Sequence, residues 1–115
     1  MRIAVVIPLY NAAPWIARTI QSVLEQDCDD VRVFVVDDGS TDNSLQEVAR
    51  FGDAVSVETG PNRGACHARN RGLALAEAQG ADFVLFLDSD DYLEGPMLSG
   101  MLSEAELHGA DMVLA

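Results

Sequence analysis

The 115-residue sequence contains no lysine, and its seven arginines stand against 19 acidic residues, which gives a net charge of −12. A chain with this acidic excess repels a phosphate backbone, so the composition argues against general nucleic-acid binding. The same repulsion disfavours direct binding to an anionic membrane surface. Any anionic ligand must therefore be recognised locally, by a few well-placed groups.

Long hydrophobic runs and cysteine-rich patterns are also missing. The longest apolar runs, Ile3–Ile7 and Phe83–Leu87, are far shorter than the roughly 20 residues needed to cross a bilayer. The two cysteines, Cys28 and Cys66, have neither a metal-type spacing nor the number needed for a disulfide framework. We therefore expect a reduced, cytoplasmic protein. In a longer protein, the inner face of the membrane would be reached only through regions outside this sequence.

The residues that are present predict alternating strands and helices. Short apolar runs rich in Val, Ile, Leu and Phe are typical of strands covered on both faces, and the segments between them have helical spacing. In one helical segment Trp15 and Leu24 bound the apolar stripe, Pro14 suits the first turn, and Thr41 or Asp42 is the expected N-cap of the next helix. The predicted strands are Ile3–Ile7, Val31–Val36, Ala54–Val57, Phe83–Leu87 and the beginning of one at Asp111–Ala115; the other predicted helices include Ala65–Gln79 and Pro96–His108.

This order predicts an α/β fold, a Rossmann-like and mostly parallel sheet with helices on both faces. No repeat or linker interrupts residues 1–115, so we expect one domain. In such sheets ligands bind beyond the carboxyl ends of the strands. If the first strand lies between the second and the fourth, the loops that follow these three strands share one cleft.

The triplet Asp88-Ser89-Asp90 follows the apolar run Phe83–Leu87 directly. About one such triplet is expected by chance in a chain this rich in aspartate, and Asp27-Cys28-Asp29 is another. Its position after a strand distinguishes the first triplet, because carboxylates held there could bind Mg²⁺ or Mn²⁺ together with a diphosphate. The alternative is that these acids end the strand and cap the next helix.

A second acidic segment, Asp37-Asp38-Gly39-Ser40, allows two interpretations as well. A carboxylate there could accept hydrogen bonds from a base or from ribose hydroxyls. An Asp-Gly turn that leads into a helix is also a common connection without any ligand.

Positive charge is concentrated in a stretch without acids, from Thr59 to Ala76, which carries Arg63, Arg69 and Arg71. Arginine forks and the N–H groups at a helix start suit phosphate, so this stretch indicates an anionic ligand. For Arg71 we expect instead an ion pair with a surface acid, and for His67 an ordinary solvated or packed side chain.

Four segments together resemble the family 2 glycosyltransferases, which have the GT-A fold and use nucleotide-diphosphate sugars. They occur in the family's order and spacing and cover nearly the whole chain. The segments are Val6-Ile7-Pro8-Leu9-Tyr10-Asn11, Val36-Asp37-Asp38-Gly39-Ser40-Thr41-Asp42, Asn62-Arg63-Gly64 with Ala68-Arg69-Asn70 and Gly72, and Phe86-Leu87-Asp88-Ser89-Asp90-Asp91.

The resemblance implies roles for particular residues. The loop of Pro8 and Tyr10 and an acid of the Asp37-Asp38 pair would hold the nucleoside. Arg69 would lie near the base and phosphates and Asp88 near the ribose, and Asp90 would bind the metal, with Asp88 beside it. The position after Asn11 is often Glu or polar in the family and is Ala12 here, a small departure. The nucleotide-sugar site implied in this way comprises Pro8, Tyr10, Asn11, Asp37, Asp38, Arg69, Asp88, Ser89 and Asp90.

The reaction implied is a Mn²⁺- or Mg²⁺-dependent, inverting transfer of a sugar, most often from a UDP-sugar, to a hydroxyl of a glycan, lipid-linked or other acceptor, as in polysaccharide biosynthesis. Family members continue beyond the last motif and supply the catalytic base there. We therefore expect residues 1–115 to be a donor-binding domain incomplete at its C-terminus, inactive alone, with its base after Ala115. An exposed sheet edge would make it a homodimer or an aggregation-prone monomer.

Two other classes of function remain as alternatives. One is a nucleotide-binding module without catalysis. The other is a receiver-like phosphoacceptor domain, which would need an aspartate after the third strand and a lysine near the end. The third predicted strand is followed by Glu58-Thr59-Gly60 and the chain has no lysine, so the sequence disfavours this alternative.

Overall fold

The computed structural model describes residues 2–28, 30–98, 100 and 113–114. Within these residues no helix combines the length and the apolar character that a membrane span requires. The elements in chain order are β1 (Ile3–Leu9), α1 (Ile16–Leu24), β2 (Val31–Asp38), α2 (Ser44–Ala49), the 3-10 turn η1 (Gly52–Ala54), β3 (Ser56–Gly60), α3 (Ala65–Ala78), β4 (Phe83–Phe86) and β5 (Val113–Leu114).

The strands form one sheet in the order β3-β2-β1-β4-β5, and all four neighbouring pairs are parallel. The predicted position of the first strand between the second and the fourth is confirmed. In register, Ile3 of β1 lies beside Val31 of β2 and Phe83 of β4. The carboxyl ends of these three strands therefore meet at one edge of the sheet.

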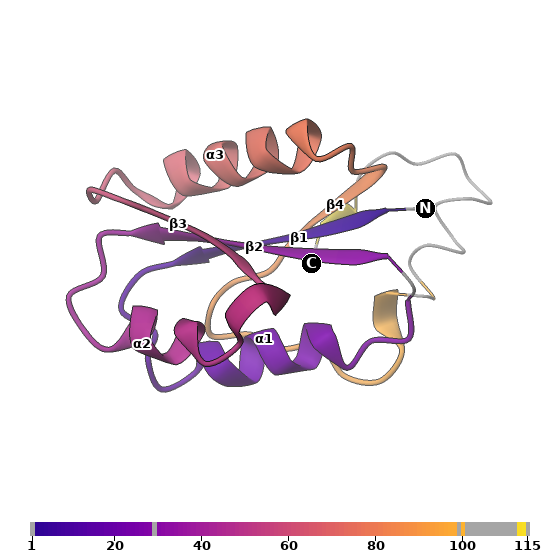
Figure 1. The fold of residues 1–115 in the computed structure, drawn as a ribbon, viewed down its shortest axis with the longest axis horizontal. Coiled ribbons are helices and arrows are strands. Elements are labelled where there is room, and N and C mark those ends of the chain that lie inside the picture. The colour runs from indigo at the N-terminus through magenta and orange to yellow at the C-terminus, as the bar shows by residue number, and fades with distance from the viewer. Residues whose placement is uncertain (1, 29, 99, 101–112, 115) are drawn as a thin grey trace.

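Helices cover both faces of the sheet, with α3 above it and α1 and α2 below it in Figure 1. Alternate residues of β1 divide between the two layers. Val5 and Ile7 belong to the larger core, together with Ile16 and Ile20 of α1. Val6 belongs to the second core, which lies on the α3 side. The predicted α/β fold with helices on both faces is confirmed.

The helix α3 approaches β1 closely at Gly72. A Cβ atom at this position would lie 2.2 Å from Cγ1 of Val6, well inside van der Waals contact. Glycine weakens a helix interior, but here it allows the helix backbone to reach the central strand. At the end of α3, Gly80 has the positive φ of 76° that is typical of a helix C-terminal stop.

Several local predictions are wrong. The third strand begins at Ser56 and not at Ala54, because η1 precedes it, and Val57 is 45% exposed. A strand at a sheet edge with little cover exposes its side chains, and β3 pairs with β2 on one side only among the described residues. The N-cap of α2 is Asn43 and not Thr41 or Asp42.

The ends of the apolar stripe on α1 also differ from the prediction. Trp15 and Leu24 are 45% and 39% exposed, whereas the centre of the stripe is buried. The predicted helix Pro96–His108 lies mostly outside the described residues, although Met97 and Leu98 are helical.

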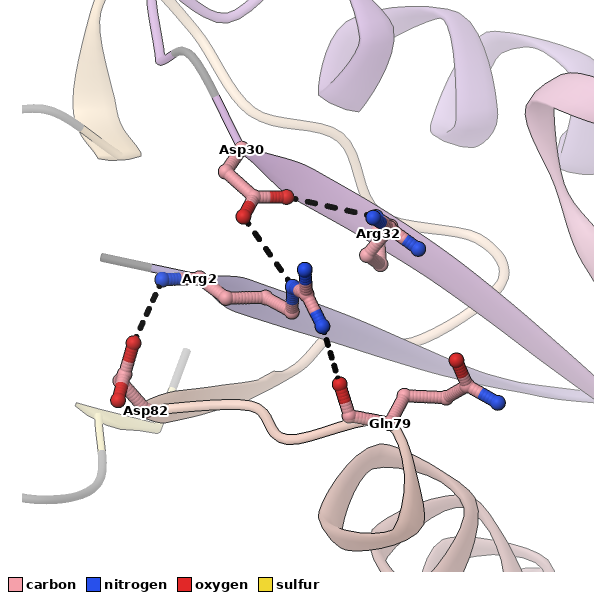
Figure 2. Close-up of polar contacts among 5 residues, drawn as sticks. All are labelled: Arg2, Asp30, Arg32, Gln79 and Asp82. Atoms are coloured by element: carbon pink, nitrogen blue, oxygen red, sulfur yellow. Dashed lines mark hydrogen bonds and ion pairs between the residues drawn. The ribbon is translucent and has the colours of Figure 1, made fainter.

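Polar contacts join three elements at the amino edge of the sheet, opposite the carboxyl ends of the strands (Figure 2). The backbone N–H of Arg2 donates to Asp82 at 2.8 Å, and its guanidinium donates to the Gln79 carbonyl and, at 3.1 Å, to Asp30. Arg32 of β2 donates to the same Asp30 carboxylate at 3.3 Å. Mainly because of the hydrogen bond from Arg2, the pKa of Asp30 lies below its ordinary value.

Candidate functional site

A cleft of about 420 Å³ opens at the carboxyl edge of the sheet. Its walls come from the loops after β1 and β4, from the end of β2 and from the first turns of α3. The structure brings together eight of the nine predicted site residues in this cleft: Pro8, Tyr10, Asn11, Asp38, Arg69, Asp88, Ser89 and Asp90. The ninth, Asp37, does not line it.

Asn11 joins the loop after β1 to the loop after β2. It adopts a φ of +47°, a left-handed conformation that asparagine tolerates better than most residues. Its Oδ1 accepts the N–H of Thr41 at 2.8 Å, and its own N–H donates to Oγ of Ser40 at 3.0 Å. The Asn11 side chain therefore contributes to the cleft mainly by fixing the shape of its wall.

A second set of bonds strengthens the same junction. The N–H of Ala12 donates to Oγ of the fully buried Ser44 at 2.9 Å, and the N–H of Ala13 donates to Asp42 at 3.2 Å. The Ser44 hydroxyl donates to the Asp42 carboxylate and is the main reason why the pKa of Asp42 is lowered. The loop after β1 is thus held at three successive backbone N–H groups.

The two acids at the end of β2 have different surroundings. Asp38 lies in the wall of the cleft, where its carboxylate accepts the N–H groups of Arg63 at 2.7 Å and Gly64 at 3.0 Å. Asp37, which is only 3% exposed, accepts the N–H of Ser40 at 3.3 Å and lines a separate cavity of about 190 Å³. Both acids stabilise turns, and only Asp38 reaches the cleft.

Three exposed carboxylates cluster in the loop after β4. Asp88, Asp90 and Asp91 each offer an oxygen, and these oxygens lie within 4.8 Å of one another. Carboxylate oxygens at this separation fit the hard-donor preference of Mg²⁺ or Mn²⁺. The Asp-x-Asp spacing predicts Asp88 and Asp90 but not Asp91, which the structure adds to the cluster.

Arg69 and Arg71 lie two positions apart on α3 and have different partners. Arg69 extends over the cleft, with its Nη2 3.2 Å from Oδ1 of Asp88. Arg71 forms a two-point ion pair with Glu58 of β3 at 2.5 and 2.6 Å, as predicted. This pair lowers the pKa of Glu58 and raises the pKa of Arg71.

Two aromatic side chains lie open at the cleft. Tyr10 is 49% exposed and Trp15 is 45% exposed, and both line the cavity. Large aromatic rings exposed in a cleft provide flat surfaces for a planar or apolar part of a ligand. Trp15 is a second residue that the sequence argument missed, because its spacing also fits the buried stripe of α1.

The cleft therefore combines aromatic surfaces, one guanidinium and a group of carboxylates suited to a divalent cation. Such a set can bind a ligand that has a planar ring at one end and a metal-binding anionic group at the other. Comparison with known proteins identifies the class. The sequence profile named Glycosyl transferase family 2 matches residues 4–115, and the chain belongs to this family.

Curated relatives support this assignment. The chain is 31% identical over 114 residues to the uncharacterized glycosyltransferase EpsJ of Bacillus subtilis. This match covers 96% of the chain and 32% of EpsJ. It is 34% identical over 119 residues to the poly(ribitol-phosphate) beta-N-acetylglucosaminyltransferase TarS of Staphylococcus aureus. This match covers 99% of the chain and 20% of TarS. The chain thus spans a fifth to a third of the length of these relatives.

Solved structures agree with the fold. Residues 1–349 of S. aureus TarS superpose with a TM-score of 0.85 at 33% identity, over 95% of this chain and 33% of that one, and this fragment has also been solved with UDP and with UDP-GlcNAc. The mannosyltransferase PcManGT of Pyrobaculum calidifontis, in complex with GDP-Man and Mn²⁺, gives a TM-score of 0.78 at 27% identity, over 90% of this chain and 32% of that one. The fold is of the GT-A type.

Proposed function

We propose that this chain binds the nucleotide-sugar donor of a metal-dependent, inverting glycosyltransferase, with UDP as the nucleotide. The observation that carries the proposal is the cleft at the carboxyl edge of the sheet, where Arg69, Asp88, Asp90 and two exposed aromatic rings meet, with Asp91 clustered beside the two acids. The complexes of the TarS fragment with UDP and UDP-GlcNAc, at 33% and 32% identity to this chain, support UDP over the GDP-sugar of the less similar PcManGT, at 27% identity.

Each group in the cleft has a definite part in this function. Tyr10 and Trp15 offer ring surfaces to the planar base or the sugar, and Asp38 offers a carboxylate to their polar groups. Asp88, Asp90 and Asp91 would hold Mn²⁺ or Mg²⁺, which when bound would neutralise the charge that develops on the diphosphate as the sugar leaves. The Arg69 guanidinium adds positive charge at the same place.

The acceptor side of the reaction is a separate proposal. The hydroxyl of a glycan, lipid-linked or other acceptor attacks the anomeric carbon as the bond to the diphosphate oxygen breaks, and a base takes the hydroxyl proton. In the cleft of the described residues, Asp88 and Asp90 are assigned to the metal, and the Asp38 carboxylate already accepts the N–H groups of Arg63 and Gly64, so we assign the base to none of these acids. We therefore expect the 115-residue chain to bind donor without transferring sugar to an acceptor.

Metal-linked nucleotide binding is tested by thermal melts with UDP, GDP, CDP and ADP, each in Mn²⁺ and in EDTA. A ligand that binds only the folded chain stabilises it by about 2.7 kcal/mol at a hundredfold excess over its Kd. We expect UDP to raise the melting temperature most, and much more in Mn²⁺ than in EDTA. Asp90→Asn should remove most of the difference, whereas the distant Asp53→Asn should keep it.

The two arginines of α3 provide a second matched comparison in the same assay. Arg69→Lys keeps the charge but loses the planar fork, so UDP binding should weaken about tenfold. Arg71→Lys disturbs only the pair with Glu58 and should leave UDP binding unchanged. Equal UDP stabilisation in Mn²⁺ and EDTA would refute the metal, and no stabilisation by any of the four nucleotides would refute the donor site.

A further inference from the structure

The loop that carries the three acids has little support from the sheet. β4 ends at Phe86, and the last bond to the central strand is from the Leu87 N–H to the Val6 carbonyl at 3.0 Å. Beyond it, the N–H of Asp91 closes a turn onto the Asp88 carbonyl at 3.0 Å, and residues 91–96 have no regular structure. The placement of the carboxylates must therefore depend on side chains from another element.

The helix α1 supplies that support, first through Thr19. This residue is fully buried, and its Oγ1 lies 2.9 Å from the Ser89 carbonyl and 2.5 Å from the Asp91 carbonyl. The Trp15 carbonyl of the same helix lies farther away, at 3.2 Å, and a hydroxyl has one hydrogen to donate, so Thr19 bonds to one of these carbonyls at a time. Ser89 and Asp91 flank Asp90, so whichever of these two carbonyls accepts the hydrogen, the hydroxyl anchors the turn next to the central acid.

Two further side chains continue the support along the same face of the helix. Oγ of Ser22 accepts the N–H of Leu93 at 3.0 Å. The carboxamide of Gln26, just after the end of α1, accepts the N–H of Leu98 at 2.9 Å and donates to the Gly95 carbonyl at 2.8 Å. Positions 19, 22 and 26 follow the spacing of one helix face. These three side chains, Thr19, Ser22 and Gln26, form a polar row, and their hydrogen bonds take the place of the strand pairing that the loop lacks.

We propose that Thr19 is a positioning residue for the divalent-cation site, acting through the backbone of Ser89 and Asp91. The inference rests on the proposed function, because only a bound cation gives a reason to hold Asp88, Asp90 and Asp91 together. Three carboxylates repel one another, so the loop needs a fixed backbone to keep their oxygens within reach of one ion. Outer contacts of this kind commonly change metal affinity by 10- to 100-fold.

The test compares Thr19→Val, which keeps the shape of the side chain and removes its donor, with Thr19→Ser, which restores the donor. Mn²⁺ affinity is measured by titration calorimetry without nucleotide, and loop mobility by amide hydrogen exchange over residues 88–95. We expect Thr19→Val to weaken Mn²⁺ binding about tenfold and to speed exchange in the loop. Thr19→Ser should remain within about threefold of the wild type.

Ile20→Val is the matched control, because it trims the fully buried neighbour on the core face of α1 and leaves the polar row intact. It should lower the melting temperature without changing Mn²⁺ affinity. Faster loop exchange in Thr19→Val with unchanged Mn²⁺ affinity would indicate a purely structural hydroxyl and overturn the proposal. A wild-type chain that fails to bind Mn²⁺ would instead refute the metal site itself, and this inference with it.

Discussion

The contact between Gly72 and Val6 is the point where one missing side chain determines how closely α3 packs on the sheet. An alanine at position 72 would gain helix propensity worth about 1 kcal/mol. Its Cβ would also lie 2.2 Å from Cγ1 of Val6, in a second core that is fully buried at this position. Overpacking of this kind typically costs 1–3 kcal/mol, so the clash outweighs the propensity.

We therefore predict that Gly72→Ala lowers the free energy of unfolding by up to about 2 kcal/mol, measured by urea denaturation. Gly60→Ala should change it by less than about 0.5 kcal/mol, because nothing lies within 4 Å of a Cβ at position 60. In a Val6→Ala background the cost of Gly72→Ala should shrink, since the clashing methyl group is gone. Additive effects of the two substitutions would contradict the close contact.

At single positions, the sequence predicts which residues line the cleft better than it predicts which contacts each of them makes. The loops could be predicted because parallel strands bring their carboxyl ends together. The sequence could not predict which of Asp37 and Asp38 reaches the cleft. β2 continues through both residues, and successive side chains of a strand point to opposite faces. The engagement of Asn11 with the Thr41 backbone likewise depends on how two loops meet.

At the scale of elements, Asp30 joins the starts of β1 and β2, because both Arg2 and Arg32 donate to its carboxylate (Figure 2). The hydrogen bond from Arg2 is the largest cause of its lowered pKa, and the charges of both arginines lower it further. A carboxyl group with a lower pKa in the folded state than in the unfolded state adds stability when ionised. That stability is present above the ordinary pKa of 3.8 and is lost as the pH falls through the folded value.

Asp30→Asn should therefore lower the melting temperature slightly at pH 6, and the gap to the wild type should close as the pH is brought below 3.8. The effect is small because the three side chains are between 32% and 49% exposed and surface ion pairs contribute little. Asp53→Asn, which removes an acid without an ion pair in the described part of the chain, is the matched control for the loss of one negative charge. A gap that stays constant with pH would argue against the ion pairs.

Apolar patterns in this sequence predict where the strands lie more reliably than they predict how deeply each strand is buried. β1, β2 and β4 coincide with continuous apolar runs and are covered on both faces. β3 was expected to be equally buried, but the order of strands along the chain does not specify which of them lies at the edge of the sheet. The polar row of α1 escaped prediction for a similar reason, since its partners are backbone groups about 70 residues away.

At the scale of the whole molecule, most of the positive charge is already paired. Among the residues that the structure describes, five of the seven arginines form ion pairs, and Arg18 lies over the Tyr92 ring at 4.1 Å. With a net charge of −12, the chain as a whole attracts cations and repels a free nucleoside diphosphate. Nucleotide binding should therefore depend on the cation that precedes or accompanies it.

This charge balance predicts how Mn²⁺ binding varies with ionic strength. The Debye length falls from about 10 Å in 0.1 M salt to about 3 Å in 1 M salt, so distant acids contribute only in the dilute buffer. We expect the Kd for Mn²⁺ to rise several-fold between 0.1 M and 1 M NaCl, measured by titration calorimetry. Binding should persist at 1 M, because the clustered oxygens of Asp88, Asp90 and Asp91 would contact the ion directly.

A variant with two distant acids removed separates the field of the molecule from the local ligands. Asp53 precedes β3, and Glu77 lies in the last turn of α3, so both are at the amino edge of the sheet, away from the cleft. In 0.1 M salt, the double variant Asp53→Asn/Glu77→Gln should bind Mn²⁺ slightly more weakly than the wild type, with a Kd raised by less than about twofold. In 1 M salt the two Kd values should be equal. Asp90→Asn should weaken binding strongly at both concentrations. If Mn²⁺ affinity in the wild type does not vary with salt, the net charge has no part in attracting the cation, and the three carboxylates account for its binding alone.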